Sequence, residues 1–357
     1  MDTFQRKIDF SFKTNQKILN LIGSIDSFKG KWSNLEKKES VYLKELRNIS
    51  TIKSTGASTR IEGSSLADSE IKKLLNNIQI SKLKTRDQQE VVGYYEVLEI
   101  IIESYSDIKI SKNYIQQFHQ KLLGHSTKDE SHRGYYKNTS NKVVATYPDG
   151  TQKTIFNTTQ PHLVESEMAL LFDWTDTQFE LAEIHPLVVI ALFVYEFLSI
   201  HPFTDGNGRL ARLLTTLLLL KKEYVFVKYI SFESLIEQKK RSYYQALMAG
   251  QKNRYLPSET IDKWVLFFLN CLKTLIGRFE TEFNAFKTKG GYLSDRQKRI
   301  LEFIKKEQPI KLSDLSKAFA KVSIHTLKKD LQYLKREQFI ESIGKNKGTF
   351  YLERTKG

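Results

Sequence analysis

Cysteine is almost absent from this 357-residue chain, and long apolar runs are missing. The single cysteine, Cys271, excludes a disulfide within the chain, and its apolar surroundings predict a buried thiol. The N-terminal sequence MDTFQRKIDF has no apolar stretch of the kind found in a secretory signal. The longest apolar run, 210–220, is too short for a membrane span and contains Arg212. We therefore expect a soluble cytoplasmic protein with no membrane partner.

The overall composition is that of a folded protein, but its charge is uneven. A hydrophobic content of 40% with 27% charged residues excludes wholesale disorder, and 357 residues suffice for two or three domains. Residues 287–357 carry 18 Lys/Arg against 8 Asp/Glu, whereas the preceding 286 residues carry 38 against 33. This asymmetry predicts a separate basic module with an anionic partner.

Apolar residues three and four apart predict helices over most of the chain. The expected helical ranges are 55–77 with a break at Gly63, 90–103, 110–123, 163–174, 185–199, 210–220, 233–249 and 259–287. Two strands, 141–147 and 151–156, flank the turn sequence Pro148-Asp149-Gly150. We therefore predict a mainly α fold, with a helical core and one inserted β-hairpin.

The most informative segment is HPFTDGNGRLAR, residues 201–212, which we expect to form a loop between two apolar helices. Gly206 and Gly208 let consecutive amides point into one concavity, and the N-terminus of the next helix also favours an anion. Arg209 and Arg212 lie three residues apart, so we expect them to share a helix face and to reach the same anion. Their planar guanidinium groups suit phosphate oxygens.

Two further residues of this segment favour a catalytic role for the predicted phosphate site. Asp205 is a hard oxygen ligand suited to Mg²⁺, and His201 titrates near neutral pH and can take a proton from a hydroxyl. Phe203 is most simply an anchor in the core. Each residue taken singly has an ordinary structural interpretation; their concentration within twelve positions at a helix entrance favours catalysis.

The segment resembles the signature of the Fic family, HPFx(D/E)GNGRxxR, at every fixed position. The resemblance extends roughly over residues 55–270 and includes the sequence YYQAL at 243–247. It implies a helical enzyme that transfers AMP from ATP to a Tyr, Thr or Ser hydroxyl of a target protein, with Mg²⁺ as cofactor. Implied roles are general base for His201, Mg²⁺ ligand for Asp205, phosphate cradle for Gly206, Asn207 and Gly208, and contacts to the distal phosphates for Arg209 and Arg212.

Further roles are implied by the same resemblance. The hairpin 141–156 resembles the family's flap, which aligns an extended target segment by strand addition. Gly208 favours nucleotidyl transfer, because the related Doc-type kinases carry a lysine at this position. Gln238 stands where the family often has Asn, which places it near the nucleoside and leaves the choice of base open.

An upstream sequence, Ser58-Thr59-Arg60-Ile61-Glu62-Gly63, resembles the family's inhibitory motif. The resemblance implies that Glu62 pairs with Arg212, so that this arginine cannot hold the γ-phosphate of ATP. Ser58 is expected to cap or orient the short helix that carries Glu62. In some relatives this glutamate also supports removal of AMP, and this second activity stays open.

The basic C-terminal segment is predicted to form helices at 294–306, 312–319 and 323–337, then strands at 339–343 and 349–352. This order resembles a winged helix-turn-helix with 323–337 as recognition helix. His325, Thr326, Lys328 and Lys329 are then expected to face solvent, and Lys345 and Lys347 to contact phosphates. DNA is the favoured partner, with protein contact as the alternative.

We expect three domains: a helical region with the inhibitory motif at 1–90, a Fic catalytic core at 91–287, and a winged helix at 288–357, joined to the core by Gly290-Gly291. An alternative function is a nucleotide-sensing, DNA-binding regulator without turnover. A second alternative is transfer of another group, UMP or phosphocholine. A homodimer is also compatible with the sequence.

Overall fold

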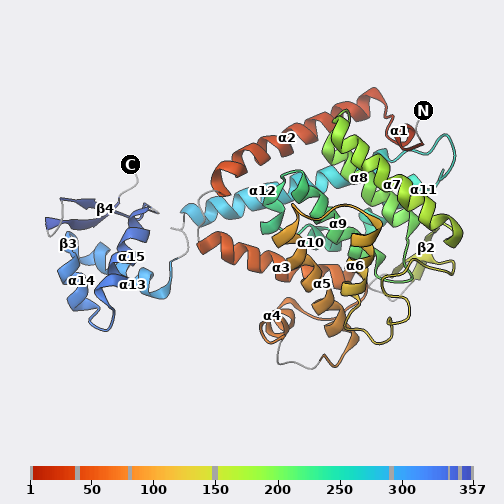
Figure 1. Ribbon diagram of the computed structural model, residues 1–357. Coiled ribbons are helices and arrows are strands. Elements are labelled where there is room, and N and C mark those ends of the chain that lie inside the picture. Colours follow the sequence, from red (N-terminus) through yellow and green to blue (C-terminus); the bar gives the residue numbers. More distant parts are fainter. Residues whose placement is uncertain are drawn as a thin grey trace. The chain divides into compact units, whose positions relative to one another are not determined.

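The computed structural model describes residues 3–36, 41–78, 83–146, 152–288, 293–336, 338–344 and 348–354 (Figure 1). The chain divides into two compact units, Met1–Arg278 and Phe279–Gly357. Each unit has its own core and is considered by itself.

Within its described residues, the first unit is helical apart from one hairpin, as the sequence predicts (Figure 1). The strongly apolar helix α8 (Pro186–Ile200) packs against α9 (Asn207–Lys221), and α7 (Pro161–Leu181) packs on α8. Every residue from Leu187 to Ile200 is buried, as expected for a helix that is apolar on all sides. The other helices are α1 (Thr3–Lys7), α2 (Phe12–Glu36), α3 (Val41–Ile61), α4 (Asp68–Asn76), α5 (Arg86–Ser104), α6 (Lys112–Leu122), the 3₁₀ helix η1 (Val225–Tyr229), α10 (Phe232–Gln238), α11 (Lys240–Gln251) and α12 (Asp262–Thr288).

Several helix boundaries differ from those predicted. The 25-residue helix α2 has no counterpart among the predicted ranges, because its apolar face is diluted by polar residues. The range 233–249 is broken at Lys239 into α10 and α11. The predicted break at Gly63 is confirmed: this glycine has φ +112° and lies between α3 and α4.

Cys271 is 1% exposed, and burial raises the pKa of its thiol to about 11.

The predicted hairpin consists of β1 (Lys142–Thr146) and β2 (Gln152–Asn157), which pair antiparallel. Lys142 lies opposite Asn157, and the register shifts between Val143 and Val144. The turn residues Pro148, Asp149 and Gly150 lie outside the described residues. Strand β2 packs against α11, which places the hairpin beside the second half of the helical unit.

The second unit contains the three helices and the two strands that the sequence predicts. They are α13 (Asp295–Glu307), α14 (Leu312–Ala318), α15 (Ile324–Arg336), β4 (Ile340–Ile343) and β5 (Phe350–Glu353). A short strand that the sequence did not reveal, β3 (Ile310–Lys311), completes an antiparallel sheet in the order β3-β5-β4. Its core includes Ile300, Ile304, Leu327, Leu331 and Leu334. Gly290, Gly291, Lys345 and Lys347 lie outside the described residues.

Across the described parts of the chain, no helix combines the length and the apolar character that a membrane crossing requires.

Candidate active site

His201 ends α8 in a left-handed backbone conformation with φ 53°, which is unusual for a residue other than glycine. Its Nδ1 lies 3.2 Å from the carbonyl oxygen of Leu198. A carbonyl only accepts, so Nδ1 carries the hydrogen and Nε2 is the nitrogen that can receive a proton. Burial lowers the pKa of His201 to about 4, which keeps the ring neutral at pH 7. The ring is therefore neutral, with an unprotonated Nε2.

The loop after His201 is closed by Asn207 and anchored by Phe203. The Asn207 side chain accepts from the Phe203 N–H at 2.9 Å and donates to the Phe203 carbonyl at 2.7 Å. The Phe203 ring is fully buried, which places the predicted anchor in the core. With 1% exposure, Asn207 uses its side chain to shape the loop, so only its backbone N–H could take part in the predicted phosphate cradle.

His119 of α6 supports this loop, and the sequence analysis missed it. Its ring stacks on Phe203 with 3.8 Å between centroids. Its Nδ1 accepts the Gly134 N–H at 2.8 Å, so Nε2 carries the hydrogen and donates to the Asp205 carbonyl at 2.9 Å. Burial lowers the pKa of His119 to about 4. A single histidine within an amphipathic pattern gave no signal of this role.

Helix α9 begins within the motif, at Asn207, and not after Arg209 as predicted. Gly206 is its N-cap with φ 77°, a conformation that favours glycine. Gly208 lies in the first turn of α9. A side chain at this position would have no room, because a Cβ built on Gly208 would overlap Glu62 Oε1. The carboxylate of Glu62 thus lies at the N-terminus of α9, where the helix dipole favours an anion.

The two motif arginines do not face one anion, as had been expected, but turn to different partners. Arg212 donates to Glu62 Oε1 at 2.8 Å, to the Ser58 hydroxyl at 2.8 Å and to the Ser58 carbonyl at 2.9 Å. Arg209 contacts Glu90 of α5 at 3.2 Å and Asp205 at 3.3 Å. Both guanidinium groups are almost fully buried, with 1% exposure for Arg209 and 3% for Arg212. The predicted pair of Glu62 with Arg212 is therefore present.

Ser58 does not cap a helix, because it lies close to the C-terminal end of the long helix α3. Its contribution is instead two oxygen acceptors for Arg212. The end of α3 is held by two further cations. Arg60 pairs with Glu237 of α10 through Nε at 2.7 Å and Nη2 at 3.1 Å, and Lys240 Nζ donates to the Ile61 carbonyl at 2.7 Å. These contacts fix the position of Glu62.

Asp205 faces Arg86, the first residue of α5, with 2.6 Å between Oδ2 and Nη2. Its Oδ1 accepts the Gly206 N–H at 2.6 Å. Burial raises the pKa of Asp205, but Arg209, this N–H and Arg86 together lower it below its ordinary value. The carboxylate is therefore ionised at neutral pH.

Residues 109–219, which include His119, the hairpin and the motif, match the family model of the Fic/DOC family. This segment is a Fic domain. Over 139 residues the chain is 32% identical to a protein adenylyltransferase Fic of Nematostella vectensis, covering 38% of this chain and 29% of that protein. It is 26% identical over 221 residues to the protein adenylyltransferase Fic of Drosophila willistoni, covering 61% of this chain and 39% of that protein.

The chain thus spans well under half the length of these curated relatives. Among solved structures, a Fic family protein from Desulfovibrio desulfuricans G20 shares the fold with a TM-score of 0.67, at 21% identity and 98% coverage of both chains. Glu62 and Arg86 lie outside the matched Fic segment, although both contact it.

Lys137 joins the Fic domain's hairpin to the turn that carries His201. Its Nζ donates to Asn141 Oδ1 at 2.8 Å, to Thr158 Oγ1 at 2.7 Å and to the Ile200 carbonyl at 3.1 Å. These contacts occupy all three of its hydrogens. Burial lowers the pKa of this ammonium group to about 8. Both ends of the hairpin are thereby tied to the last turn of α8.

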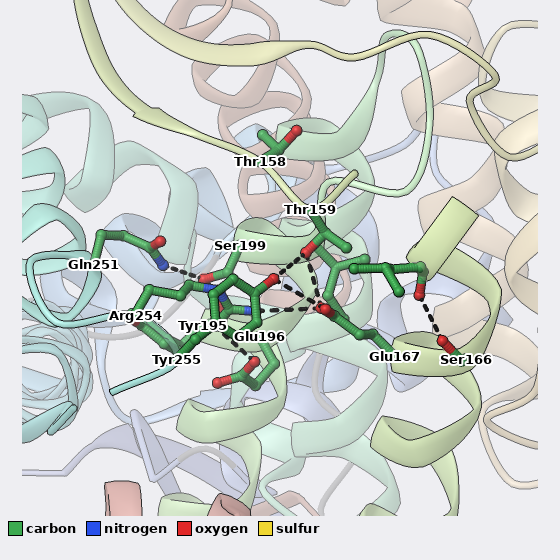
Figure 2. Close-up of polar contacts among 12 residues, drawn as sticks. Thr158, Thr159, Ser166, Glu167, Tyr195, Glu196, Ser199, Gln251, Arg254 and Tyr255 are labelled. Atoms are coloured by element: carbon green, nitrogen blue, oxygen red, sulfur yellow. Dashed lines mark hydrogen bonds and ion pairs between the residues drawn. The ribbon is translucent and has the colours of Figure 1, made fainter. Parts of the chain in front are cut away.

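A second polar network lies along α8 on the side of the hairpin's exit (Figure 2). Thr159 shares a hydrogen bond with the Tyr255 hydroxyl at 3.0 Å, and this hydroxyl donates to Glu167 at 2.9 Å. Arg254 pairs with Glu196 of α8 at 2.9 Å. Burial alone would lower the pKa of this guanidinium, but the negative charge of Glu196 raises it. The network links α7, α8 and the segment after α11.

Gln238 is not brought to the motif: its side chain accepts from Arg278 of α12 at 2.9 Å on an exposed surface. A different glutamine, Gln251, donates to Ser199, two residues before His201. Gln251 also lines a groove of about 470 Å³ between β2 and α11. The groove is lined by Ile155, Phe156, Gln245, Met248, Ala249, Gln251 and Lys252.

Proposed function

We propose that this protein is an adenylyltransferase that moves AMP from ATP to a Tyr, Thr or Ser hydroxyl of a target protein. The observation that carries the proposal is a neutral imidazole, His201, separated by one short loop from the N-terminus of α9, where the helix dipole favours an anion. The adenylyltransferase names of the curated relatives agree with it.

In the proposed reaction, His201 Nε2 takes the proton of the target hydroxyl. The hydroxyl oxygen forms a bond to the α-phosphorus, the bond from that phosphorus to the bridging oxygen breaks, and pyrophosphate leaves. The amides at the start of α9 would hold the phosphates, and Arg212 would hold the distal phosphate once it is free of Glu62. Tying Lys137 to the Ile200 carbonyl keeps His201 in its strained turn.

The residues of the site fit a Mg²⁺ ion bound together with ATP. Asp205 offers an ionised, 40% exposed carboxylate beside the phosphate-binding turn. The described residues hold no cluster of three or more potential metal-binding side chains, so phosphates and water would complete the shell, as is common for Mg²⁺. When bound, the ion would neutralise phosphate charge.

Glu62 is proposed to inhibit the reaction. Its carboxylate contacts Arg212 and lies over Gly208, where a phosphate of ATP would otherwise bind. Two anions cannot share one small cationic site, so ATP is held in a non-reactive position while Glu62 remains there.

The target is proposed to add an extended segment to the hairpin at 141–156. In the described structure β1 and β2 form a two-stranded sheet, so each has a free long edge with backbone groups for a third strand. Lys137 and the network of Figure 2 hold this sheet next to His201.

The test is labelling of lysate proteins with each labelled NTP. We expect Glu62→Gly to label targets with ATP, and Glu62→Gly with His201→Ala to show no labelling. His162→Ala in the Glu62→Gly background is the matched control, because His162 is an exposed histidine on α7. Labelling that survives loss of His201 would contradict the proposal.

The alternatives are separate outcomes of this test. Preferential labelling with UTP would indicate UMP transfer, and a phosphocholine donor is tested in parallel. AMP release from labelled target by the wild type, lost in Glu62→Gly, would show the second activity. Nucleotide binding without any transfer would favour the nucleotide-sensing regulator.

For the second unit we propose a winged helix that binds DNA. The observation that favours this is the exposed face of α15, which carries His325, Lys328 and Lys329, with Thr326 partly exposed. The 357-residue chain should bind duplex DNA with an affinity that falls steeply with salt, and Lys328→Glu with Lys329→Glu should weaken this binding. Absence of binding at low salt would contradict this proposal and favour a protein partner, of which a second copy in a homodimer is one case.

A further inference from the structure

Arg86 bridges the carboxylates of Asp205 and Glu90 at the edge of the proposed ATP site, and a third carboxylate, Asp129 Oδ2, lies 3.8 Å from its Nη2. Its Nη2 lies 2.6 Å from Asp205 Oδ2, and its Nε donates to Glu90 Oε1 at 2.8 Å. Asp205 Oδ1 already accepts the Gly206 N–H at 2.6 Å and Arg209 Nη2 at 3.3 Å. Arg86 therefore engages the oxygen of Asp205 that the loop's own contacts leave available.

We propose that Arg86 restrains metal binding by holding Asp205 Oδ2 until the nucleotide is bound with its metal. This inference rests on the proposed function. A divalent cation needs that oxygen at short range, and a guanidinium in contact with it both occupies the oxygen and repels the cation. Release is feasible because the Arg86 side chain is 39% exposed, while Glu90, 11% exposed, keeps it close by.

The restraint by Arg86 is physically linked to the restraint by Glu62. Asp87, the residue after Arg86, accepts hydrogen bonds from the Ser65 N–H at 2.8 Å and the Ser65 hydroxyl at 3.0 Å. Ser65 lies three residues after Glu62, in the segment between α3 and α4. The start of α5 is thereby tied to the segment that carries Glu62.

Two charged groups of the site, Arg212 and Asp205, are thus paired with residues from the N-terminal part of the chain. Glu62 takes Arg212, which ATP would need for a distal phosphate, and Arg86 takes Asp205, which the metal would need. The Glu62–Arg212 contact opposes binding of the ATP phosphates, and the Arg86–Asp205 contact opposes binding of the metal ion that accompanies them.

The chain offers a matched control in Arg47. This arginine also pairs with a glutamate of α5, Glu99, at 3.2 Å, and its side chain is 33% exposed. Its partners Glu99 and Glu103 lie towards the other end of α5 from Arg86. Replacing Arg47 therefore removes a similar charge and a similar ion pair without touching Asp205.

The experiment measures Mn²⁺, as a spectroscopic substitute for Mg²⁺, by electron paramagnetic resonance in the presence of saturating ATP. All proteins carry His201→Ala, so that ATP is not consumed. We expect Arg86→Gln to bind Mn²⁺ roughly three- to tenfold more tightly than the parent. Arg86→Lys should gain less, because lysine keeps the charge but cannot bridge Glu90 and Asp205. Arg47→Gln should equal the parent.

Affinity for ATP in EDTA is measured for the same proteins. Mn²⁺ affinity that is equal or weaker in Arg86→Gln would overturn the inference, and so would an equal gain in ATP affinity in EDTA, because the effect would then concern phosphate and not metal. A parent that binds no ATP with or without Mn²⁺ would overturn the proposed function as well.

Discussion

The two halves of the motif are held in different ways. The backbone of residues 201–206 is fixed by uncharged contacts: Phe203 is buried, Asn207 closes the turn, and His119 of α6 donates to the Asp205 carbonyl. Residues 207–212 are instead paired with acids from far along the chain, Glu62 of the segment after α3 and Glu90 of α5. The backbone of the first half is thus held rigidly, whereas the charged side chains of Asp205, Arg209 and Arg212 are where a ligand can compete with an internal partner.

Among the variants considered, Phe203→Ala should lower the free energy of unfolding most, because it removes the anchor of residues 201–206. Removing a fully buried aromatic ring leaves a cavity, which typically lowers the free energy of unfolding by about 3–5 kcal/mol. Urea denaturation measures this change. Tyr135→Ala is the control, because Tyr135 is 69% exposed, and it should cost less than about 0.5 kcal/mol. Equal costs for both variants would contradict the anchoring role.

Acidic pH should destabilise the fold around residues 201–206, because it protonates two buried histidines, His119 and His201. The folded-state pKa values of His119 and His201 are about 4, below the ordinary 6.5, so the unfolded chain binds more protons between these values. The free energy of unfolding should therefore fall as pH falls from 6.5 towards 4, by up to about 3 kcal/mol for the fully buried His119. Denaturation across this range in wild type and His119→Gln measures the contribution. A flat profile in wild type would contradict it.

Arg60→Gln should loosen the charged half without touching the nucleotide site. Arg60 is 24% exposed and pairs with Glu237, which holds the end of α3. Its loss should lower the free energy of unfolding by about 1 kcal/mol and raise AMP transfer to a smaller extent than Glu62→Gly. Glu237→Gln removes the same pair from the other side and should give a similar gain. Opposite effects of the two variants on transfer would argue against the pair as a support for Glu62.

Ser58→Ala should have the smallest effect on AMP transfer. It removes one hydroxyl acceptor from Arg212 but leaves the Ser58 carbonyl and Glu62 in place. We expect a cost of about 1 kcal/mol in unfolding free energy and a slight rise in AMP transfer. Denaturation and labelling of the same preparation measure both. A gain in transfer as large as that of Glu62→Gly would show that the serine, and not the glutamate, holds Arg212.

The contrast also explains what the sequence could predict. Apolar periodicity located α8 and α9 and the helices of the second unit, and the motif and its resemblance brought His201, Asp205 and Arg212 together. The partners that come from other helices, His119, Arg86 and Glu90, left no local signal, because a lone polar residue on a helix does not indicate what it will contact. The separation of Arg209 from Arg212 was missed for the same reason: their spacing is local, but their partners lie on α5 and beyond α3.

Gln238 and Asn207 illustrate a second limit. Gln238 was placed near the nucleoside because it stands where the Fic family often has Asn, whereas its side chain contacts Arg278 of α12. Asn207 was assigned to the phosphate cradle through the resemblance to the Fic family, whereas its side chain satisfies the backbone of Phe203. A polar residue within a binding motif can be needed to shape the loop instead of contacting the ligand.

The central claim is that Glu62 occupies the anion site of α9 and so restrains Arg212. The most direct measurement is the rate of labelled AMP incorporation at saturating ATP for wild type, Glu62→Gln and Glu62→Gly. The structure predicts at least about a tenfold higher rate for Glu62→Gly, since a charge-assisted contact to a buried arginine is typically worth 1.5 kcal/mol or more. Glu62→Gln should lie between the two, because it fills the space without the charge. Equal rates for all three proteins would contradict the claim.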